Sequence, residues 1–322
     1  MKLRNLFKRS KKGQSDNTEI PIRHVQFNFD EATMSKYCWD DNAFSSAFLL
    51  SFSAFIPHGE HFVIDTIRAC REDIKDPALK ARVAGLIGQE AMHSKAHEEF
   101  NAVYQEKGID LRRIDQLGEW FFKRHLPTIL PRSGQLAVAC AIEHFTALMA
   151  QRSFSELALM DKLDVGAKEF LTWHLVEEME HKSVAFDVYQ ELVGSYWIRA
   201  VAMQLIPIYT SSIFAYSVQS ILRTPGYRQS LPKMVGGFRF WFGLKGYFSK
   251  MQPGILRYFH VDYHPSQLET DAALHEWQHR LFSPGGMLEG IVIKTLVSKE
   301  NQQEAPKGNL QEVSQPKCRS QI

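Results

Sequence analysis

The sequence predicts an all-helical protein, and three observations support this prediction. Apolar residues recur at helical spacing over long stretches, whereas the alternating Val, Ile and Thr runs typical of strands are scarce. Proline and glycine fall where these stretches begin or end. The chain has 322 residues, of which 44% are hydrophobic and 23% charged, and this composition is typical of a folded globular protein.

The expected helices follow from these signals in chain order. The first is expected at 41–72, kinked or interrupted at Pro57 and Gly59. The second begins at Asp76-Pro77, with Asp as N-cap and Pro in the first turn, and ends before Gly108. Further helices are expected at 111–126, at 133–160 with Ser133 as N-cap, at 165–193, at 200–222 and at 265–282.

Charge and cysteine content exclude several classes of protein. The net charge is +2, but the first twelve residues contain six Lys or Arg, so the rest of the chain is net acidic. A basic nucleic-acid-binding body is therefore not expected. The four cysteines are widely separated and form no CxxC pair, which argues against a disulfide framework and favours a reducing cytoplasm. The N-terminus also lacks the apolar run of a signal peptide.

The segment 200–222 raises the question of a membrane. It contains no charged residue and is long enough to span a bilayer. It also contains Pro207 and seven Ser, Thr or Gln residues, which lipid would solvate poorly. We therefore expect a buried or interfacial helix, with a spanning helix as the alternative, in a cytoplasmic protein that can associate with a membrane. The basic tail 1–19 is expected to be solvated, or else to contact anionic lipid.

Four glutamates lie within otherwise apolar helical stretches, where an unpaired charge is costly. Two of them are followed three residues later by histidine, so that both side chains of each Glu-x-x-His share one helix face. In chain order the set is Glu60, Glu90 with His93, Glu143, and Glu178 with His181. This is the ligand inventory of ferritin-like di-iron and di-manganese bundles. A buried salt-bridge network is the alternative, but these stretches contain few Lys or Arg.

Neighbouring residues extend this set. His174 lies four residues before Glu178 on the same helix face, and we expect it to be a third histidine ligand. His97 has a similar place after His93, but Glu98 and Glu99 indicate that the helix reaches solvent there. Glu177 and Gln89 point away from the ligands and suit groups that hydrogen-bond a ligand histidine on the facing helix.

The motifs PHGEHF, QEAMH, EHFTA and WHLVEEMEHKSVAFDVY resemble those of a bacterial family of predicted metal-dependent hydrolases, from about residue 20 to 290. The ligand spacing is also similar to the seven-ligand set of di-iron aryl-amine N-oxygenases. That second resemblance implies that all seven side chains bind iron, namely Glu60, Glu90, His93, Glu143, His174, Glu178 and His181. Two features depart from the ferritin-like pattern. Gln89 stands where many ferritin-like proteins have Asp, and Pro57 and Gly59 lie beside Glu60, where they affect the expected register of the helix that carries this ligand.

A competing zinc motif occurs at His275, Glu276 and His279, which match HExxH. Its third ligand would have to be Glu289 or Glu300. We favour an exposed amphipathic helix here, with a zinc site as the alternative.

These features predict a non-haem di-iron or Fe/Mn oxidase or monooxygenase that uses O₂ and an electron donor. Its substrate is expected to be small and mostly apolar, with Phe145, Trp173 and Phe186 either lining the pocket or belonging to the core. A metal-dependent hydrolase that uses a metal-activated water is the alternative, and an iron-storage protein is the second alternative. The expected cofactor is two Fe ions, with Mn able to replace Fe and Zn as the alternative metal.

The same features divide the chain into four regions. A basic tail (1–19) precedes a ferritin-like bundle with a dinuclear metal site (20–195). A helical extension (196–290), which can contact a membrane or a partner, follows the bundle. A polar tail (298–322) is predicted to be disordered.

Overall fold

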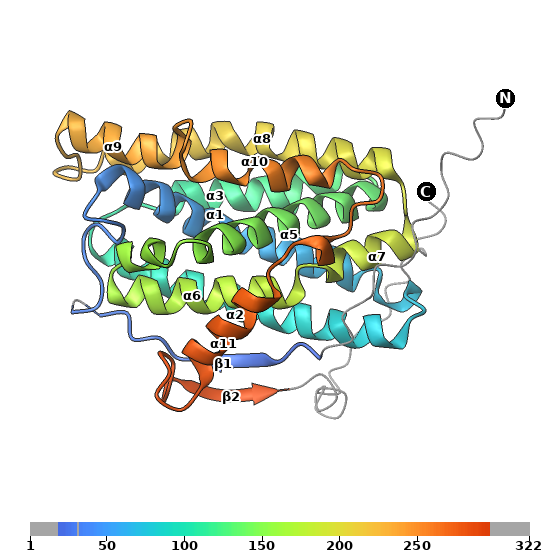
Figure 1. Cartoon of the computed structure of the whole chain (residues 1–322). Helices are drawn as coiled ribbons and strands as arrows, with labels where there is room; N and C mark the ends of the chain where they lie inside the picture. The colour runs from blue at the N-terminus through green and yellow to red at the C-terminus, as the bar shows by residue number, and fades with distance from the viewer. Residues whose placement is uncertain (1–18, 31, 297–322) are drawn as a thin grey trace, which may run out of the picture.

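The structure, a computed structural model, describes residues 19–30 and 32–296. It is mostly helical, as predicted, and Figure 1 shows the helices stacked in layers. The predicted polar tail and all but the last residue of the basic tail lie outside the described residues.

Four long helices form the centre of the molecule. They are α1 (Ala43–Arg68), α2 (Pro77–Glu106), α5 (Arg132–Phe154) and α6 (Val165–His181). Helix α1 packs against α2 and α5, and α6 packs against α5 and α2. Because each of the four contacts two of the others, their inner faces share one core.

Side-chain caps begin three of these helices. Asn42, Asp76 and Asp164 each accept a hydrogen bond from a backbone N–H in the first turn of α1, α2 and α6. Helix α1 continues through Pro57 and Gly59, so the predicted interruption is absent. The predicted cap Ser133 lies inside α5, which begins one residue earlier after Pro131.

Shorter elements connect and cover the four helices. Between α2 and α5 lie α3 (Arg112–Glu119), a π-helical turn (Trp120–His125) and α4 (Leu126–Ile129). After α6 come α7 (Val184–Leu192), α8 (Tyr196–Leu222), α9 (Leu231–Phe242), α10 (Tyr247–Tyr258) and α11 (Asp271–Phe282). Single 3₁₀ turns occur at Arg71–Asp73, Leu157–Lys162 and Pro265–Gln267.

The predicted helix 165–193 is in fact two helices, α6 and α7, which are separated at Lys182 and Ser183. The buried Lys182 Nζ donates to Thr270 Oγ1 at 2.5 Å, and Ser183 Oγ accepts from Arg82 at 2.7 Å. These partners come from distant parts of the chain, so helical spacing alone does not predict the break.

A small sheet is the exception to the all-helical prediction. Strands β1 (Ile22–Val25) and β2 (Val292–Leu296) pair antiparallel, with Ile22 opposite Leu296. Strand β1 also packs on α2. The sheet therefore joins the two ends of the described chain below the helices in Figure 1.

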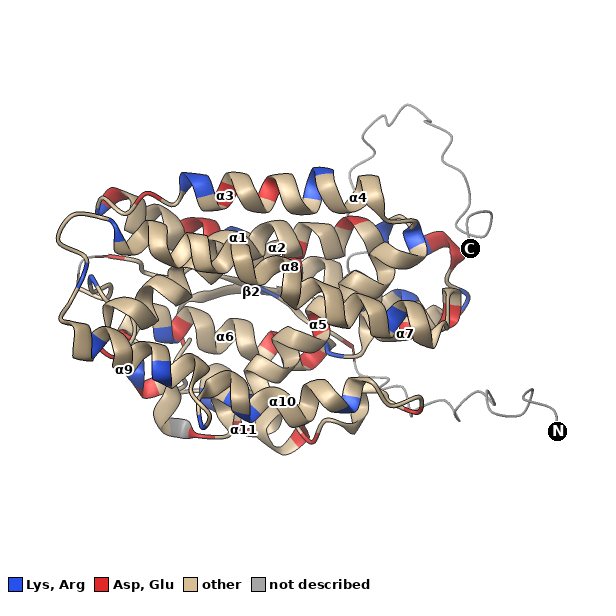
Figure 2. Ribbon diagram, turned by 90° about the horizontal axis from the view of Figure 1, so that it is seen from above, with Lys and Arg blue, Asp and Glu red and all other residues tan. Residues whose placement is uncertain are grey.

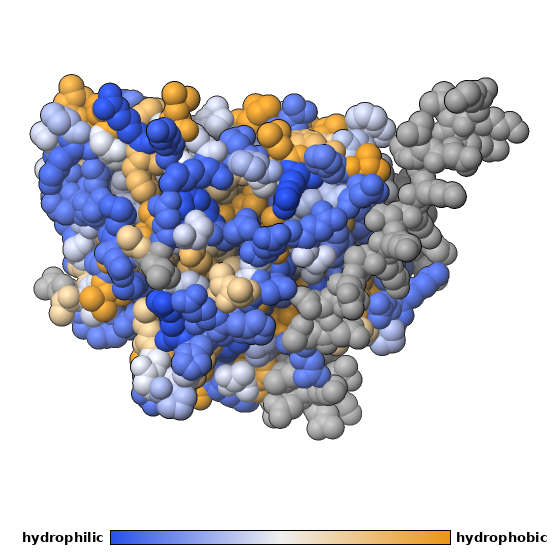
Figure 3. Space-filling model, viewed as in Figure 1, coloured by the Kyte–Doolittle hydropathy of each residue, from blue (hydrophilic) through white to orange (hydrophobic). Residues whose placement is uncertain are grey.

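Helices α1 and α8 are both long and apolar enough to cross a membrane by length and composition. The most apolar window of α1 is 89% buried, as in the core of a soluble protein, whereas that of α8 is only 22% buried. Helix α8 packs on α1 and α5 along one side and exposes the other. Figure 3 shows apolar side chains along the upper edge of the molecule, where α8, α9 and α10 lie.

Candidate metal centre

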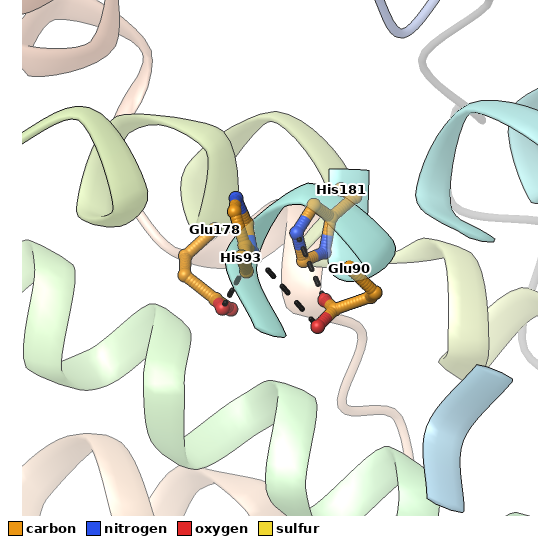
Figure 4. A group of neighbouring side chains, drawn as sticks. All are labelled: Glu90, His93, Glu178 and His181. Carbon is orange, nitrogen blue, oxygen red and sulfur yellow. Dashed lines mark ion pairs between the residues drawn. The ribbon is translucent and has the colours of Figure 1, made fainter. Parts of the chain in front are cut away.

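The two Glu-x-x-His pairs face each other across α2 and α6. One ligand atom from each of Glu90, His93, Glu178 and His181 lies within 4.8 Å of the other three, and Figure 4 shows the four side chains converging. All four are buried, and both histidines are fully so. The i, i+3 spacing produces this arrangement because it places each pair on one face of its helix.

A second group adjoins the first. Glu60 of α1, His97 of α2 and His174 of α6 also bring ligand atoms within 4.8 Å of one another. His174 Nε2 lies 2.8 Å from Glu178 Oε1, so the two groups share one buried space. His97 is fully buried, and the prediction that its helix position approaches solvent was wrong. The four-residue spacing of His97 from His93 indicated that both lie on the same face of the helix.

Glu143 of α5 completes the predicted set. Its Oε2 lies 2.8 Å from His181 Nδ1, and the carboxyl group is buried. The structure therefore brings all seven predicted side chains together, and their roles as ligands stay a prediction.

Several of these donor atoms are buried without a hydrogen-bond partner. They are Glu60 Oε1, Glu90 Oε1, His93 Nδ1 and His181 Nε2. Among the described residues, none of the four glutamates pairs with Lys or Arg; their ionic partners are all histidines. Buried oxygen and nitrogen atoms without a partner are costly unless a hydrogen bond or a bound cation compensates for the lost contact with water. The donor set fits one or more cations, and the salt-bridge alternative lacks the necessary basic residues.

The buried groups of the centre shift one another's pKa values in both directions. Burial raises the pKa of Glu60 well above its ordinary value and that of Glu143 to about 8. Burial opposes charge on His181, but the carboxylates of Glu143 and Glu178 outweigh it and raise the His181 pKa to about 10. Burial likewise disfavours the Glu178 carboxylate, yet His181 and His174 lower its pKa to about 2.

A second layer of residues orients the candidate ligand His93. Glu177 Oε2 lies 3.1 Å from His93 Nε2, which leaves His93 Nδ1 facing Glu90 and Glu178. Glu177 Oε1 accepts from Trp173 Nε1 at 2.9 Å and from Arg23 Nη1 at 2.8 Å. This pattern is typical of a metal-binding histidine with a carboxylate behind it.

Arg23 on β1 was not among the predicted site residues. It also forms two hydrogen bonds with Glu180, and these carboxylates raise its pKa although burial opposes it. Gln89 donates to the Pro21 carbonyl at 2.8 Å and to Glu180 at 2.7 Å, not to a histidine. The pairing of β1 with a strand at the far end of the chain carries no local sequence signal, so Arg23 could not be predicted.

A narrow cavity of about 50 Å³ opens beside the centre. Its polar part includes His97, His174, Glu178, Thr146 and Ser153, and the Thr146 hydroxyl donates to Glu178 Oε2. Apolar residues from α1, α5, α6, α9 and the neighbouring loops line most of the rest, and Tyr247 of α10 also contributes. The predicted pocket residues Phe145, Trp173 and Phe186 are absent from this lining.

The HExxH residues lie elsewhere. His275, Glu276 and His279 are exposed on α11, and Glu276 pairs with Arg280. Within 19–30 and 32–296, neither histidine is gathered with two other metal-binding side chains. Glu289 accepts from the Gly285 backbone, and Glu300 lies outside the described residues.

Comparison with protein families identifies the chain. The model of a family described as predicted metal-dependent hydrolase matches residues 21–269. The chain belongs to this family. The match includes every residue of the candidate metal centre and Arg23, and it ends before the HExxH segment. Comparisons with curated proteins and with solved structures gave no match.

Membership of the metal-dependent hydrolase family bears on the predicted reaction. It supports metal dependence and favours hydrolysis, which was the alternative in the sequence-based prediction. It gives no support to the preferred prediction of a di-iron oxidase or monooxygenase, and it leaves the identity of the metal open.

Proposed function

We propose that this protein is a hydrolase whose metal ions are held by Glu60, Glu90, His93, Glu143, His174, Glu178 and His181. The observation that carries the proposal is the set of buried carboxylate oxygens and imidazole nitrogens with no hydrogen-bond partner, in a cluster whose glutamates pair only with histidines among the described residues. Membership of the metal-dependent hydrolase family supports the same reaction class.

The arrangement we infer is a ferritin-like dinuclear centre. Helices α1, α2, α5 and α6 each supply a carboxylate, and α2 and α6 also supply histidines. Two adjoining donor groups, one around Glu60 and one around Glu90, are consistent with two ions. His97 is an additional candidate ligand, because its Nε2 lies 3.8 Å from Glu60 Oε1.

Bound divalent metal would lower the pKa of a water molecule and polarise the carbonyl or phosphoryl group to be cleaved. The protein's own residues have three tasks around it. Glu177 and Arg23 fix the orientation of His93. Thr146 orients the Glu178 carboxylate from the cavity side. The apolar cavity walls exclude bulk water and bind the uncharged part of the substrate.

The cavity lining indicates the substrate class. Its side chains are mostly aliphatic or aromatic and include no Lys or Arg. Such a lining suits the apolar group of a neutral substrate better than the charged oxygens of a phosphoester. We therefore propose a neutral substrate with an apolar group, such as an acyl ester, rather than a phosphoester.

The test is hydrolysis by the purified chain loaded separately with Zn²⁺, Mn²⁺ or Fe²⁺. p-Nitrophenyl esters of increasing acyl length are compared with bis(p-nitrophenyl) phosphate. We expect one metal form to cleave the esters, with Glu90→Gln reducing kcat/KM at least about 100-fold. The matched variant Glu276→Gln in the exposed HExxH motif should retain activity. Equal loss in both variants, or activity that needs no metal, would contradict the proposal.

Metal-dependent oxidation is the second candidate function. The observation that favours it is the donor set, in which four glutamates and at least three histidines surround one buried space, because binuclear oxidases use carboxylate-rich sites of this type. The test is O₂ uptake by the iron-loaded chain with a chemical reductant and small apolar substrates. Substrate-dependent O₂ uptake without ester hydrolysis would replace the hydrolase proposal with this one.

A further inference from the structure

Helices α8, α9 and α10 present exposed apolar side chains on one side of the molecule, which we call the α8–α10 face. Figure 3 shows groups of apolar side chains along the upper edge of the molecule, where these helices lie. Exposed members include Trp197, Ile208, Tyr209, Leu231, Phe238, Phe242, Leu244 and Leu256, and Leu244 is fully exposed. Exposed apolar areas of this kind are typical of contacts with membranes or other proteins.

All charged residues in the segment that forms this face are basic. From residue 192 to residue 261 the chain contains eight Lys or Arg and no Asp or Glu. Lys233 and Lys250 pair with acidic residues from other segments. Five exposed cations have no acidic partner among the described residues, namely Arg223, Arg228, Arg239, Lys245 and Arg257. Figure 2 views the molecule from this side and shows the charged residues.

We propose that the α8–α10 face binds the surface of an anionic phospholipid membrane, with α8 lying in the membrane plane. Exposed Trp, Phe, Leu and Ile side chains would enter the boundary between headgroups and acyl chains. The unpaired Lys and Arg side chains would lie beside lipid phosphates. This inference does not depend on the reaction that the metal centre performs.

The packing of helix α8 suits a position parallel to the membrane surface and not one that spans the bilayer. Its inner side packs on α1 and α5 and buries Arg199, Ser217 and Ile221. Two of its outer hydroxyl groups are satisfied within the helix, since Thr210 donates to the Ile206 carbonyl at 2.9 Å and Ser211 to Ile208 at 2.7 Å. Hydroxyl groups bonded in this way can enter an apolar layer at lower cost.

Charge distinguishes the membrane from a second copy of the chain. A two-fold contact would place the same surface on both sides, and the unpaired cations would face each other. Like charges brought together oppose association. An anionic lipid surface instead supplies the complementary charge. Acidic residues of the flanking α3 do not reverse this sign, because Arg112 and Arg113 of the same helix balance Asp115 and Glu119.

The α8–α10 face also covers the cavity of the metal centre. Trp241 of α9 and Tyr247 of α10 line that cavity together with Glu178 and His174. A membrane-bound orientation therefore places the elements that cover the cavity against lipid, from which an apolar substrate could be taken.

Co-sedimentation of the full chain with vesicles tests the proposal. The vesicles are pure phosphatidylcholine or an equimolar mixture with phosphatidylglycerol. We expect binding to the anionic vesicles that weakens as salt is added. A variant with one exposed residue changed on each helix, Ile208→Gln, Phe238→Gln and Leu256→Gln, should bind at least about tenfold more weakly. Val165→Gln with Ile293→Gln, two exposed apolar positions outside this face, should bind as wild type.

Two further variants separate the sources of charge. Changing Arg239, Lys245 and Arg257 to Gln should reduce binding to anionic vesicles, whereas changing Arg68, Lys95 and Lys107 to Gln should not. Loss of binding when only the six basic residues of the first twelve are changed to Gln would assign binding to the tail and contradict the proposal. Absence of binding to either vesicle would also contradict it. A third result would also contradict the proposal. If sedimentation velocity shows a wild-type dimer that becomes a monomer in the variant of Ile208, Phe238 and Leu256, the face joins two copies of the chain.

Discussion

Arg23 connects strand β1 to the candidate metal centre. Its guanidinium hydrogen-bonds both Glu177 and Glu180, and Glu177 in turn contacts His93. Removing one partner of a buried ion pair leaves the other charge uncompensated. The position of His93 therefore depends on a residue about seventy positions away in sequence.

We predict that Arg23→Gln weakens metal binding by about 10- to 100-fold, as expected when the group behind a ligand histidine is disturbed. Competition with a chromogenic chelator measures the change in Kd. Arg112→Gln, which removes an exposed arginine paired only with Asp110, is the matched control. Equal affinities of the Arg23 variant and the wild type would show that Glu177 orients His93 unaided.

A pH dependence follows from the raised pKa values of His181, about 10, and Glu143, about 8. At neutral pH the hydrogen-bonded Glu143–His181 pair holds a proton that a metal must displace, because ligands bind in their deprotonated forms. Affinity should therefore rise with pH, by up to about tenfold per pH unit for each displaced proton. Calorimetry in buffers of different ionisation enthalpy measures the protons released. Binding at pH 7 without proton release would contradict this account.

At the scale of elements, glycines of α2 leave the space into which Ile20 and strand β1 pack. A Cβ added at Gly85 would lie 2.5 Å from Ile20 Cβ and 2.8 Å from its carbonyl oxygen. Contacts this short require the backbone at Ile20 to move, and with it the strand that carries Arg23. Gly236 in α9 has nothing within 4 Å of the same added atom.

We predict opposite effects of alanine at these two helical glycines. Gly85→Ala should lower the free energy of unfolding by about 1–3 kcal/mol, because the strain outweighs the gain in helix propensity. Gly236→Ala should raise it by about 0.5–1 kcal/mol. Urea denaturation measures both. A Gly85→Ala protein as stable as Gly236→Ala would show that the contact with Ile20 relaxes without cost.

The helices that carry the ligands were predictable because their signals are local. Asp76 and Pro77 begin α2 as expected, and the Glu-x-x-His spacing placed both pairs on inner faces. The break at Lys182, the pairing of β1 with β2, and helices α9 and α10 were missed. The break and the strand pairing depend on distant partners. Helices α9 and α10 lie in a segment rich in glycine and aromatic residues, and Pro253 lies inside α10.

At the scale of the whole molecule, the metal-free state contains four buried glutamates with no Lys or Arg partner among the described residues. Ions bound by the folded chain and not by the unfolded chain must stabilise it, by about 2.7 kcal/mol at a free concentration 100 times the Kd. We predict a higher Tm after addition of the cognate metal and a lower Tm after chelation. Scanning calorimetry measures both, with Glu90→Gln as the variant in which the shift should be much smaller. An equal shift in that variant would place the binding elsewhere.

Metal content per chain tests the central claim most directly. Fe, Mn and Zn are measured together by mass spectrometry in the wild type, Glu143→Ala and His279→Ala, purified identically and shown by circular dichroism to be folded. We predict about two ions per chain in the wild type and in His279→Ala, with most of the metal lost in Glu143→Ala. One zinc ion that survives Glu143→Ala and disappears in His279→Ala would contradict the account. Many iron ions per chain would contradict it too, in favour of iron storage.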